Sequence, residues 1–190
     1  FREEKNWHQL NANVSKISEF LKKIKIQEKD RVAAYLPNCI ETVEAFIASS
    51  SLGAIWSSCS PDFGINGVIE RFSQINPKVI FVIDKYFYNG KTINVLERIP
   101  KILKTISSIK YVVIINYPGE KYQNNKNRFK KIKVFKWSEL IKTKSKNLRF
   151  SMFDFEQELA ILYSSGTTGK PKCICHRSGG VLLQHRKEHQ

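Results

Sequence analysis

Residues 159–172 read LAILYSSGTTGKPK, an apolar run followed by a loop with two glycines, four serine or threonine residues and two lysines within ten positions. The apolar run predicts a buried strand, and a loop so rich in backbone N–H groups, hydroxyl donors and positive charge suits a polyphosphate. It is not a Walker A loop, because that motif needs a glycine where Ser164 stands, and Pro171 follows Lys170. The stretch therefore predicts a nucleotide triphosphate as the ligand of this loop.

Outward from this stretch, strand-like and helix-like segments alternate along the chain. The expected strands are 31–35, 54–57, 78–83, 111–115, 159–164 and 173–177, and the expected helices are 7–24, 40–52, 64–75, 93–106 and a last one from about Ser178. Nearly continuous apolar strands separated by helices need crossover connections. The sequence therefore predicts an α/β fold, with a largely parallel sheet and helices on both faces.

Local signals set the expected ends and faces of the helix over 40–52. Asn38, after Pro37, is placed to cap its start, and Gly53 closes it in the position where glycine is favoured. Val43, Phe46 and Ile47 are expected on its apolar side.

The net charge of +15 raises nucleic-acid binding as an alternative function. Residues 121–149 contain eleven Lys or Arg and one acid, Glu139, and so supply +10 of that charge. With little periodicity, about 116–150 is expected to be an irregular basic excursion. A solvated surface is the simpler interpretation of such a charge run.

Two short patterns raise a metal site, and neither is complete. Cys173 and Cys175 alternate along an expected strand and are interpreted as a reduced, buried pair, because zinc needs two further ligands. His185, Glu188 and His189 match the inverted zinc-peptidase signature, yet no third ligand is visible. We expect no metal held by protein side chains alone.

The loop from Tyr163 to Lys172 resembles, position for position, the phosphate loop of the adenylate-forming enzymes, which include acyl-CoA synthetases, firefly luciferases and peptide-synthetase adenylation domains. Residues 30–38 are similar to the opening strand of acyl-CoA synthetases. Residues 52–64, with the string WSSCSPDFG, are similar to the acetoacetyl-CoA synthetase branch. The spacing of His176 after Lys172 is similar to that of the acetyl- and acetoacetyl-CoA synthetases together. The resemblance covers nearly the whole chain and is weakest over 116–150.

This resemblance implies an ATP-dependent acid–thiol ligase. A carboxylate, acetoacetate in this branch, would form an acyl-adenylate with release of pyrophosphate, and CoA would then displace AMP. ATP, Mg²⁺ and CoA are the implied cofactors and small-molecule partners, and an acetyl- or propionyl-CoA synthetase is the nearest rival.

The same resemblance assigns roles to particular residues. The residues implied to bind the ATP phosphates are Ser164, Ser165, Gly166, Thr167, Thr168, Gly169 and the catalytic Lys172. Ser60, Pro61 and Asp62 are implied to contact CoA, and His176 and Trp56 are implied to contact the acyl group. Core packing is the competing interpretation for both His176 and Trp56.

Some residues depart from the family pattern, and part of the family's machinery is absent. Lys170 and the segment 173–175 replace an expected Leu and Pro-Ile-Val, and Arg177 and Arg186 replace Ser and Leu. Residues 1–190 are expected to be an incomplete N-terminal adenylation domain, without the C-terminal small domain, and inactive and poorly soluble alone. No apolar run is long enough for a membrane span, so a cytoplasmic location is expected.

Overall fold

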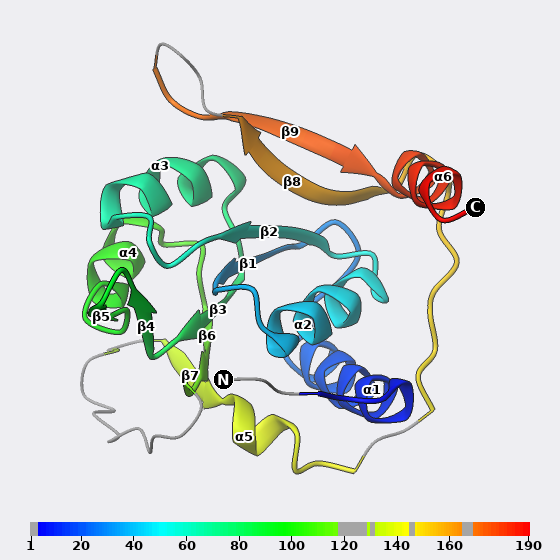
Figure 1. The fold of residues 1–190 in the computed structure, drawn as a ribbon, viewed down its shortest axis with the longest axis horizontal. Coiled ribbons are helices and arrows are strands. Elements are labelled where there is room, and N and C mark those ends of the chain that lie inside the picture. Colours follow the sequence, from blue (N-terminus) through cyan, green and yellow to red (C-terminus); the bar gives the residue numbers. More distant parts are fainter. Residues whose placement is uncertain (1–3, 118–128, 130–131, 145–146, 165–168) are drawn as a thin grey trace.

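The computed structural model describes residues 4–117, 129, 132–144, 147–164 and 169–190. Figure 1 shows the arrangement of the helices and strands in these ranges. The helices are α1 (Trp7–Lys23), α2 (Ile40–Ser50), α3 (Ile65–Ile75), α4 (Ile99–Thr105), α5 (Trp137–Leu140) and α6 (Ser178–Glu188). The strands are β1 (Arg31–Tyr35), β2 (Ile55–Cys59), β3 (Val79–Ile83), β4 (Lys85–Tyr88), β5 (Lys91–Asn94), β6 (Tyr111–Ile115), β7 (Lys133–Lys136), β8 (Glu158–Ser164) and β9 (Lys172–Arg177).

The main sheet has the strand order β7-β6-β3-β1-β2-β8-β9. Its strands pair in parallel except for β9, which runs antiparallel to β8. The predicted α/β fold with a largely parallel sheet is confirmed. Because β1 lies between β2 and β3, the connections that leave β1 and β2 run in opposite directions, which makes a topological switch point beside β1.

Helices cover both faces of the sheet, as the sequence predicts. Helices α1 and α2 pack together on one face, and α3 and α4 pack together on the other (Figure 1). Side chains alternate along a strand, so even-numbered β2 residues such as Trp56 face α2, and odd-numbered ones such as Ser57 face α3. The ring of Trp56 is 5.8 Å from that of Phe46 on α2, which fixes this assignment.

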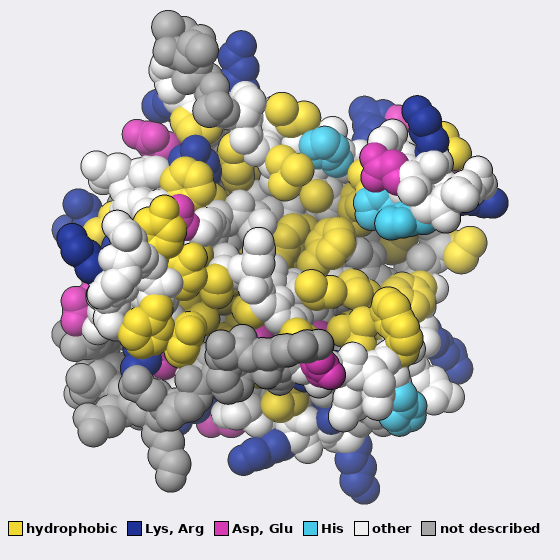
Figure 2. Space-filling view, in the orientation of Figure 1, with side chains coloured by type: hydrophobic (Ala, Val, Ile, Leu, Met, Phe, Trp, Pro, Cys, Tyr) yellow, Lys and Arg dark blue, Asp and Glu magenta, His cyan; other side chains and the backbone are white. Residues whose placement is uncertain are grey.

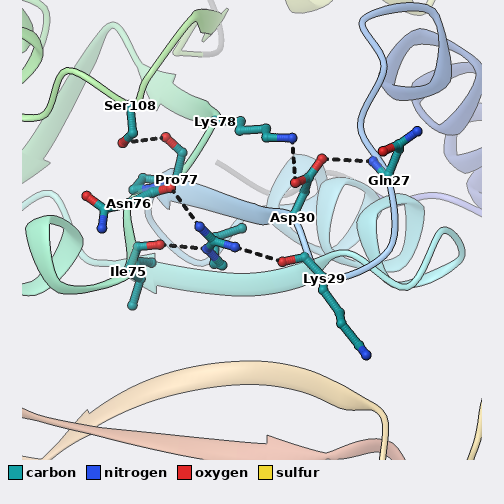
Figure 3. A network of polar contacts seen from close by, with 9 residues as sticks. Gln27, Lys29, Asp30, Ile75, Asn76, Pro77, Lys78 and Ser108 are labelled. Carbon is teal, nitrogen blue, oxygen red and sulfur yellow. Dashed lines mark hydrogen bonds and ion pairs between the residues drawn. The ribbon is translucent and has the colours of Figure 1, made fainter.

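Polar contacts at the amino-terminal edge of the sheet hold β1 to its surroundings (Figure 3). The carboxylate of Asp30 accepts from Lys78 Nζ at 2.6 Å and from the backbone N–H of Gln27 at 3.0 Å. Arg31 donates to the carbonyl oxygen of Ile75, the last residue of α3, at 2.7 Å. The loops after β1, β2 and β8 meet at the opposite, carboxyl-terminal edge of the sheet, because these strands are parallel.

The helix predicted over 93–106 is wrong in its first half. The chain first forms the antiparallel hairpin β4–β5, and α4 begins only at Ile99. Asn89 and Gly90 take positive φ angles of 47° and 70°, as the two central residues of a tight hairpin turn do. The Asn-Gly pair is the local signal that favours this hairpin over a helix.

The excursion over 116–150 is not wholly irregular, contrary to prediction. Strand β7 extends the sheet in parallel with β6, and α5 follows it directly. Trp137 is buried, with its ring 6.1 Å from that of Phe81. Residues 118–128, 130–131 and 145–146, which hold much of the basic charge, lie outside the described residues.

Two predictions about α2 are also wrong. Its N-cap is Cys39, without a side-chain cap, so Asn38 does not cap it. Phe46 and Ile47 pack against the core as predicted, but Val43 is 48% exposed, and the fully buried residues of α2 are Glu44, Ala45, Ala48 and Ser49.

None of the helices within the described residues is both long and apolar enough to cross a membrane.

Candidate functional site

The candidate site lies at the carboxyl-terminal edge of the sheet, where β1, β2 and β8 end at Tyr35, Cys59 and Ser164. In open α/β sheets, ligands bind outside the carboxyl ends of the strands, beside a topological switch point. The predicted CoA loop follows β2, and the predicted phosphate loop follows β8. The fold thus brings the two predicted loops to the same edge of the sheet.

The predicted phosphate loop connects β8 to β9, and the structure describes its two ends. Ser164 pairs with Lys172 as the last pair of the antiparallel ladder before the loop. Both residues therefore lie at the loop end of the hairpin, which we call the mouth of the hairpin. Ser164 is half-buried, Lys172 is exposed, and Gly169 has a φ of 113°, which favours glycine. A hydroxyl and an ammonium side by side at a hairpin mouth can bind an anion. Ser165, Gly166, Thr167 and Thr168 lie outside the described residues, and their assignment to phosphate stays a prediction.

Helix α3 holds the base of this hairpin. Gln74 donates from Nε2 to the carbonyl oxygen of Pro171 at 2.9 Å, next to Lys172. The guanidinium carbon of Arg71 lies 4.3 Å from the ring centre of Phe63 and 5.8 Å from that of Tyr163. Arg71 and Gln74 are three residues apart on α3 and so lie on one side of the helix. One helix therefore positions both strands where they enter the loop.

A second contact ties β8 to β2. The hydroxyl of Ser57 lies 3.0 Å from the hydroxyl of Tyr163 and donates to the carbonyl oxygen of Ile161 at 2.8 Å. Burial raises the pKa of the Tyr163 phenol, against a lowering by Ser57. The phenol therefore stays neutral at physiological pH and serves as a hydrogen-bonding group of fixed position beside the loop.

The loop after β2 is fixed by two side chains that reach it from other elements. The hydroxyl of Tyr35 donates to the carbonyl oxygen of Phe63 at 2.6 Å, and Arg98 Nη1 donates to that of Pro61 at 2.9 Å. Arg98 also donates to the Tyr35 hydroxyl at 2.7 Å. Pro61 is buried, whereas Asp62 is exposed and in contact with the Ser60 hydroxyl. The loop presents Ser60 and Asp62 from a rigid support.

Trp56 and His176 lie in one row across the sheet. Trp56 is opposite Ala160, and Ala160 is opposite His176, so both side chains point to the face covered by α2. Trp56 is only 5% exposed and packs between Phe46 and Phe81. This position favours a core-packing role for Trp56 over contact with the acyl group. His176 is half-buried and four residues along β9 from Lys172, a separation of about 13 Å in a strand.

Cys173 and Cys175 are free thiols, as predicted, but the prediction that they are buried is wrong, because both are exposed. Strand β9 is an edge strand, and the hairpin projects from the rest of the molecule (Figure 1), so little packs over it. Of the other two cysteines, Cys39 is half-buried and Cys59 is buried.

His185 and His189 lie one turn apart on the exposed surface of α6, with ring centres 6.1 Å apart. Within the described ranges, no three His, Cys, Asp or Glu side chains are grouped so that they could hold a metal ion. A third ligand for a zinc-peptidase centre is therefore missing from the described part of the chain.

Sequence reasoning missed the residues that position the loops: Ser57, Arg71, Gln74 and Arg98. Arg71 and Gln74 lie within the resembling stretch, but no local pattern marks their contacts with residues nearly 100 positions away. Arg98 sits at the start of a helix whose beginning was misplaced. Only the tertiary arrangement reveals these roles.

Comparisons with known proteins show the family and support the fold. The family described as AMP-binding enzyme matches residues 2–188. The chain is 43% identical to acetoacetyl-CoA synthetase of Xenopus tropicalis over 98% of its length, and 42% identical to acetoacetyl-coenzyme A synthetase of Rhizobium meliloti (strain 1021) over 97%. It covers 28% of each of these relatives. The solved structure of acetoacetyl-CoA synthetase from Streptomyces lividans aligns with a TM-score of 0.86 and 31% identity, over 97% of this chain and 27% of that one.

Proposed function

We propose that this chain, which belongs to the AMP-binding enzyme family, is part of an ATP-dependent ligase that joins acetoacetate to CoA. The observation that carries the proposal is the match to acetoacetyl-CoA synthetases at 42–43% identity over 97–98% of the chain. The hairpin with Ser164 and Lys172 at its mouth supports it, because it offers an anion site where the family needs one. The reaction is acetoacetate + ATP + CoA to acetoacetyl-CoA + AMP + pyrophosphate.

In the first step, an acetoacetate oxygen attacks the α-phosphorus of ATP and pyrophosphate leaves. The three phosphates repel the incoming carboxylate, so catalysis depends on positioning and on neutralising charge. Lys172 and the residues from Ser164 to Gly169 are proposed to hold the β- and γ-phosphates. Gln74 and Arg71 act as positioning residues, because they fix the strands that carry the loop.

In the second step, the CoA thiol displaces AMP from the acyl-adenylate. We assign Ser60, Pro61 and Asp62 to the approach of CoA, and His176 to the acyl group. Trp56 is left to the core, where its ring packs between two aromatic side chains. Support for the loop assignment comes from the rigid anchoring of residues 60–63 by Tyr35 and Arg98.

Magnesium is part of the proposal as the ion that neutralises the phosphate charge. Mg²⁺ keeps several waters and is usually bound through substrate phosphates and one or two carboxylates. In this mode the nucleotide phosphates, held by Lys172 and the residues from Ser164 to Gly169, would supply most of the protein-bound contacts of the ion.

The decisive experiment is an AMP-release assay on the full-length protein with acetoacetate, acetate, propionate and butyrate, each with ATP and CoA. We expect the highest kcat/KM with acetoacetate. A preference for acetate or propionate would replace the proposed substrate by that of the rival short-chain ligases. Absence of AMP release with all four acids would reject the ligase.

The location and partners follow from the same proposal. An enzyme of this kind needs only small-molecule substrates, and we place it in the cytoplasm. The basic residues over 121–149 leave nucleic-acid binding as the competing function. Salt-dependent RNA or DNA affinity, in a protein that releases no AMP, would favour that function instead.

A further inference from the structure

Cys173 and Cys175 form a pair of thiols outside the proposed nucleotide contacts. They are two residues apart on β9, so their side chains point to the same face of the sheet. This is the face of α3, because Cys173 Sγ lies 3.6 Å from Gln74 Oε1. Both thiols are exposed and neither is in a disulfide. The Lys172 and His176 side chains point to the opposite face.

The contact of Cys173 links this pair to the base of the phosphate loop. Gln74 Oε1 accepts a hydrogen bond from the Cys173 thiol, and Gln74 Nε2 donates to the carbonyl oxygen of Pro171. One side-chain amide therefore contacts both residues that flank Lys172. The same Nε2 is 2.8 Å from the carbonyl oxygen of Glu70, within α3. A group added to the Cys173 sulfur removes the S–H that donates to Gln74 Oε1. The segment around Lys172 would then lose one of the two contacts that hold it to Gln74.

We propose that Cys173 and Cys175 are a site of reversible oxidation by low-molecular-weight disulfides, and that this oxidation slows the nucleotide chemistry of the adjacent loop. The chemical site stands on the geometry of β9 and α3. Its effect on catalysis rests on the proposed function.

The oxidation takes two thiol–disulfide exchange steps. The Cys173 thiolate attacks a disulfide such as oxidised glutathione, which gives a mixed disulfide and one free glutathione thiol. Cys175 then attacks the Cys173 sulfur of the mixed disulfide and releases the second glutathione. The two protons from the cysteines end on the two glutathione thiols, so one disulfide is reduced and one is formed.

The product must distort β9, which makes it easy to reduce again. Residues two apart in a strand have Cα atoms about 6.6 Å apart, at the upper limit for a disulfide of about 6.8 Å. Closing the bond shortens the strand around Ile174, which pairs with Leu162 on β8. A strained disulfide has a higher reduction potential, so glutathione reverses it.

The other cysteines lack this combination of exposure and pairing. Burial raises the pKa of the Cys59 thiol to about 12, and Cys39 is half-buried beside Thr42. Partial burial also raises the pKa of Cys173 and of Cys175. Exchange at the pair is therefore slow at neutral pH and becomes faster as the pH rises.

The test treats full-length protein with oxidised glutathione, maps the products by peptide mass spectrometry, and measures pyrophosphate release before and after. We expect the peptide with Cys173 and Cys175 to lose two hydrogens and pyrophosphate release to fall roughly 10- to 100-fold, because small misplacements of positioned groups have effects of this size. Reduced glutathione should restore both. Cys175→Ser should stop at the mixed disulfide, and Cys173→Ser should lose the sensitivity.

Cys39→Ser is the matched control and should keep the sensitivity to oxidation in full. Oxidation confined to Cys39 or Cys59, or an oxidised pair with undiminished pyrophosphate release, would overturn the proposal. If the reduced protein releases no pyrophosphate with any acid, the proposed function fails separately. Mass mapping and amide exchange at residues 172–177 then still test the oxidation site. Oxidation of the pair should speed amide exchange in β9, and a pair that does not react with oxidised glutathione would refute the site.

Discussion

At the scale of single residues, Lys172 is the charged group in the described part of the chain that the hairpin places beside Ser164. An ammonium about 4 Å from a phosphate oxygen gains roughly 4 kcal/mol at an effective dielectric near 20, before desolvation is subtracted. Lys170 is also exposed but stands before Pro171, outside the strand pairing. Comparing the two lysines therefore separates a charge held in the strand ladder from a charge of the same sign outside it.

We predict that Lys172→Ala lowers pyrophosphate release by the full-length protein roughly 100-fold, as loss of one positioned charge-stabilising group does. Lys170→Ala is the matched control and should cost much less. Steady-state assays with saturating ATP measure both. Equal losses in the two variants would mean that only the overall charge of the loop matters.

Glu44 is a second residue with a clear electrostatic consequence. Its side chain is fully buried, and Oε1 accepts from Lys5 Nζ at 3.1 Å and Asn13 Nδ2 at 2.9 Å, while Oε2 has no hydrogen-bond partner among the described residues. Burial raises the pKa of Glu44 above its usual value of 4.5, although both partners act to lower it. Above pH 4.5 the unfolded chain loses this proton before the folded chain does.

We therefore predict that the free energy of unfolding falls as the pH rises from 4.5 through the raised pKa of Glu44. Glu44→Gln should remove this part of the pH dependence, and Glu70→Gln, at an exposed position, should retain it. Urea titrations of the full-length protein at a series of pH values give the slopes. A Glu44→Gln profile parallel to wild type would show that the buried carboxylate is not the cause.

At the scale of elements, the β4–β5 hairpin depends on its two turn residues. Gly90 has a φ of 70°, and a Cβ at this position would meet no atom within 4 Å. Any cost of a side chain here is therefore a backbone cost, about 1–2 kcal/mol for an L-residue in the left-handed region.

Gly90→Ala is accordingly predicted to lower the free energy of unfolding by about 1 kcal/mol. Asn89→Gly keeps the turn geometry accessible and should cost less. The urea midpoints of the two variants, compared at equal m-values, measure the difference. A neutral Gly90→Ala would mean that the turn is free to change its type.

The central strands could be predicted from the sequence, whereas one edge strand and the long-range contacts could not. Apolar runs such as residues 79–83 predict the central strands, because strands buried on both faces must be apolar throughout. Strand β7 was missed because Lys133 and Lys136 hide its short apolar centre in a basic segment. Local composition predicts the phosphate loop, and that assignment stays a prediction, whereas Gln74 and Arg98 act through contacts that only the assembled fold creates.

At the scale of the whole molecule, the hairpin β8–β9 and helix α6 present apolar side chains to solvent. The side chains of Leu162, Ile174, Leu182 and Leu183 are 44–61% exposed. Figure 2 shows, in the orientation of Figure 1, further apolar side chains across the middle of the molecule below the hairpin, with Lys and Arg mainly around the outline. One side of β9 is also unpaired in the described sheet, and an exposed strand edge pairs readily with another chain.

The 190-residue chain is therefore predicted to self-associate in spite of its net charge of +15. Ile174→Lys should raise the monomer fraction, since charge on an edge strand blocks edge-to-edge pairing. Exposed Val43→Lys, far from this edge, should have less effect. Light scattering after size-exclusion chromatography measures both, and a monomeric wild-type chain that melts in one cooperative step would contradict the prediction.

The pairing of β2 with β8 has a consequence for the order of folding during translation. Ser57 contacts Ile161 across 104 positions, so β2 cannot complete this side of the sheet until β8 leaves the ribosome. At 5–20 residues per second the wait is roughly 5–20 s, long enough for the strands from β1 to β6 to assemble first. Strand β8, which leads into the loop between β8 and β9, therefore docks late onto a preformed sheet, and the open edge of β2 is a natural site for chaperone protection in the interval.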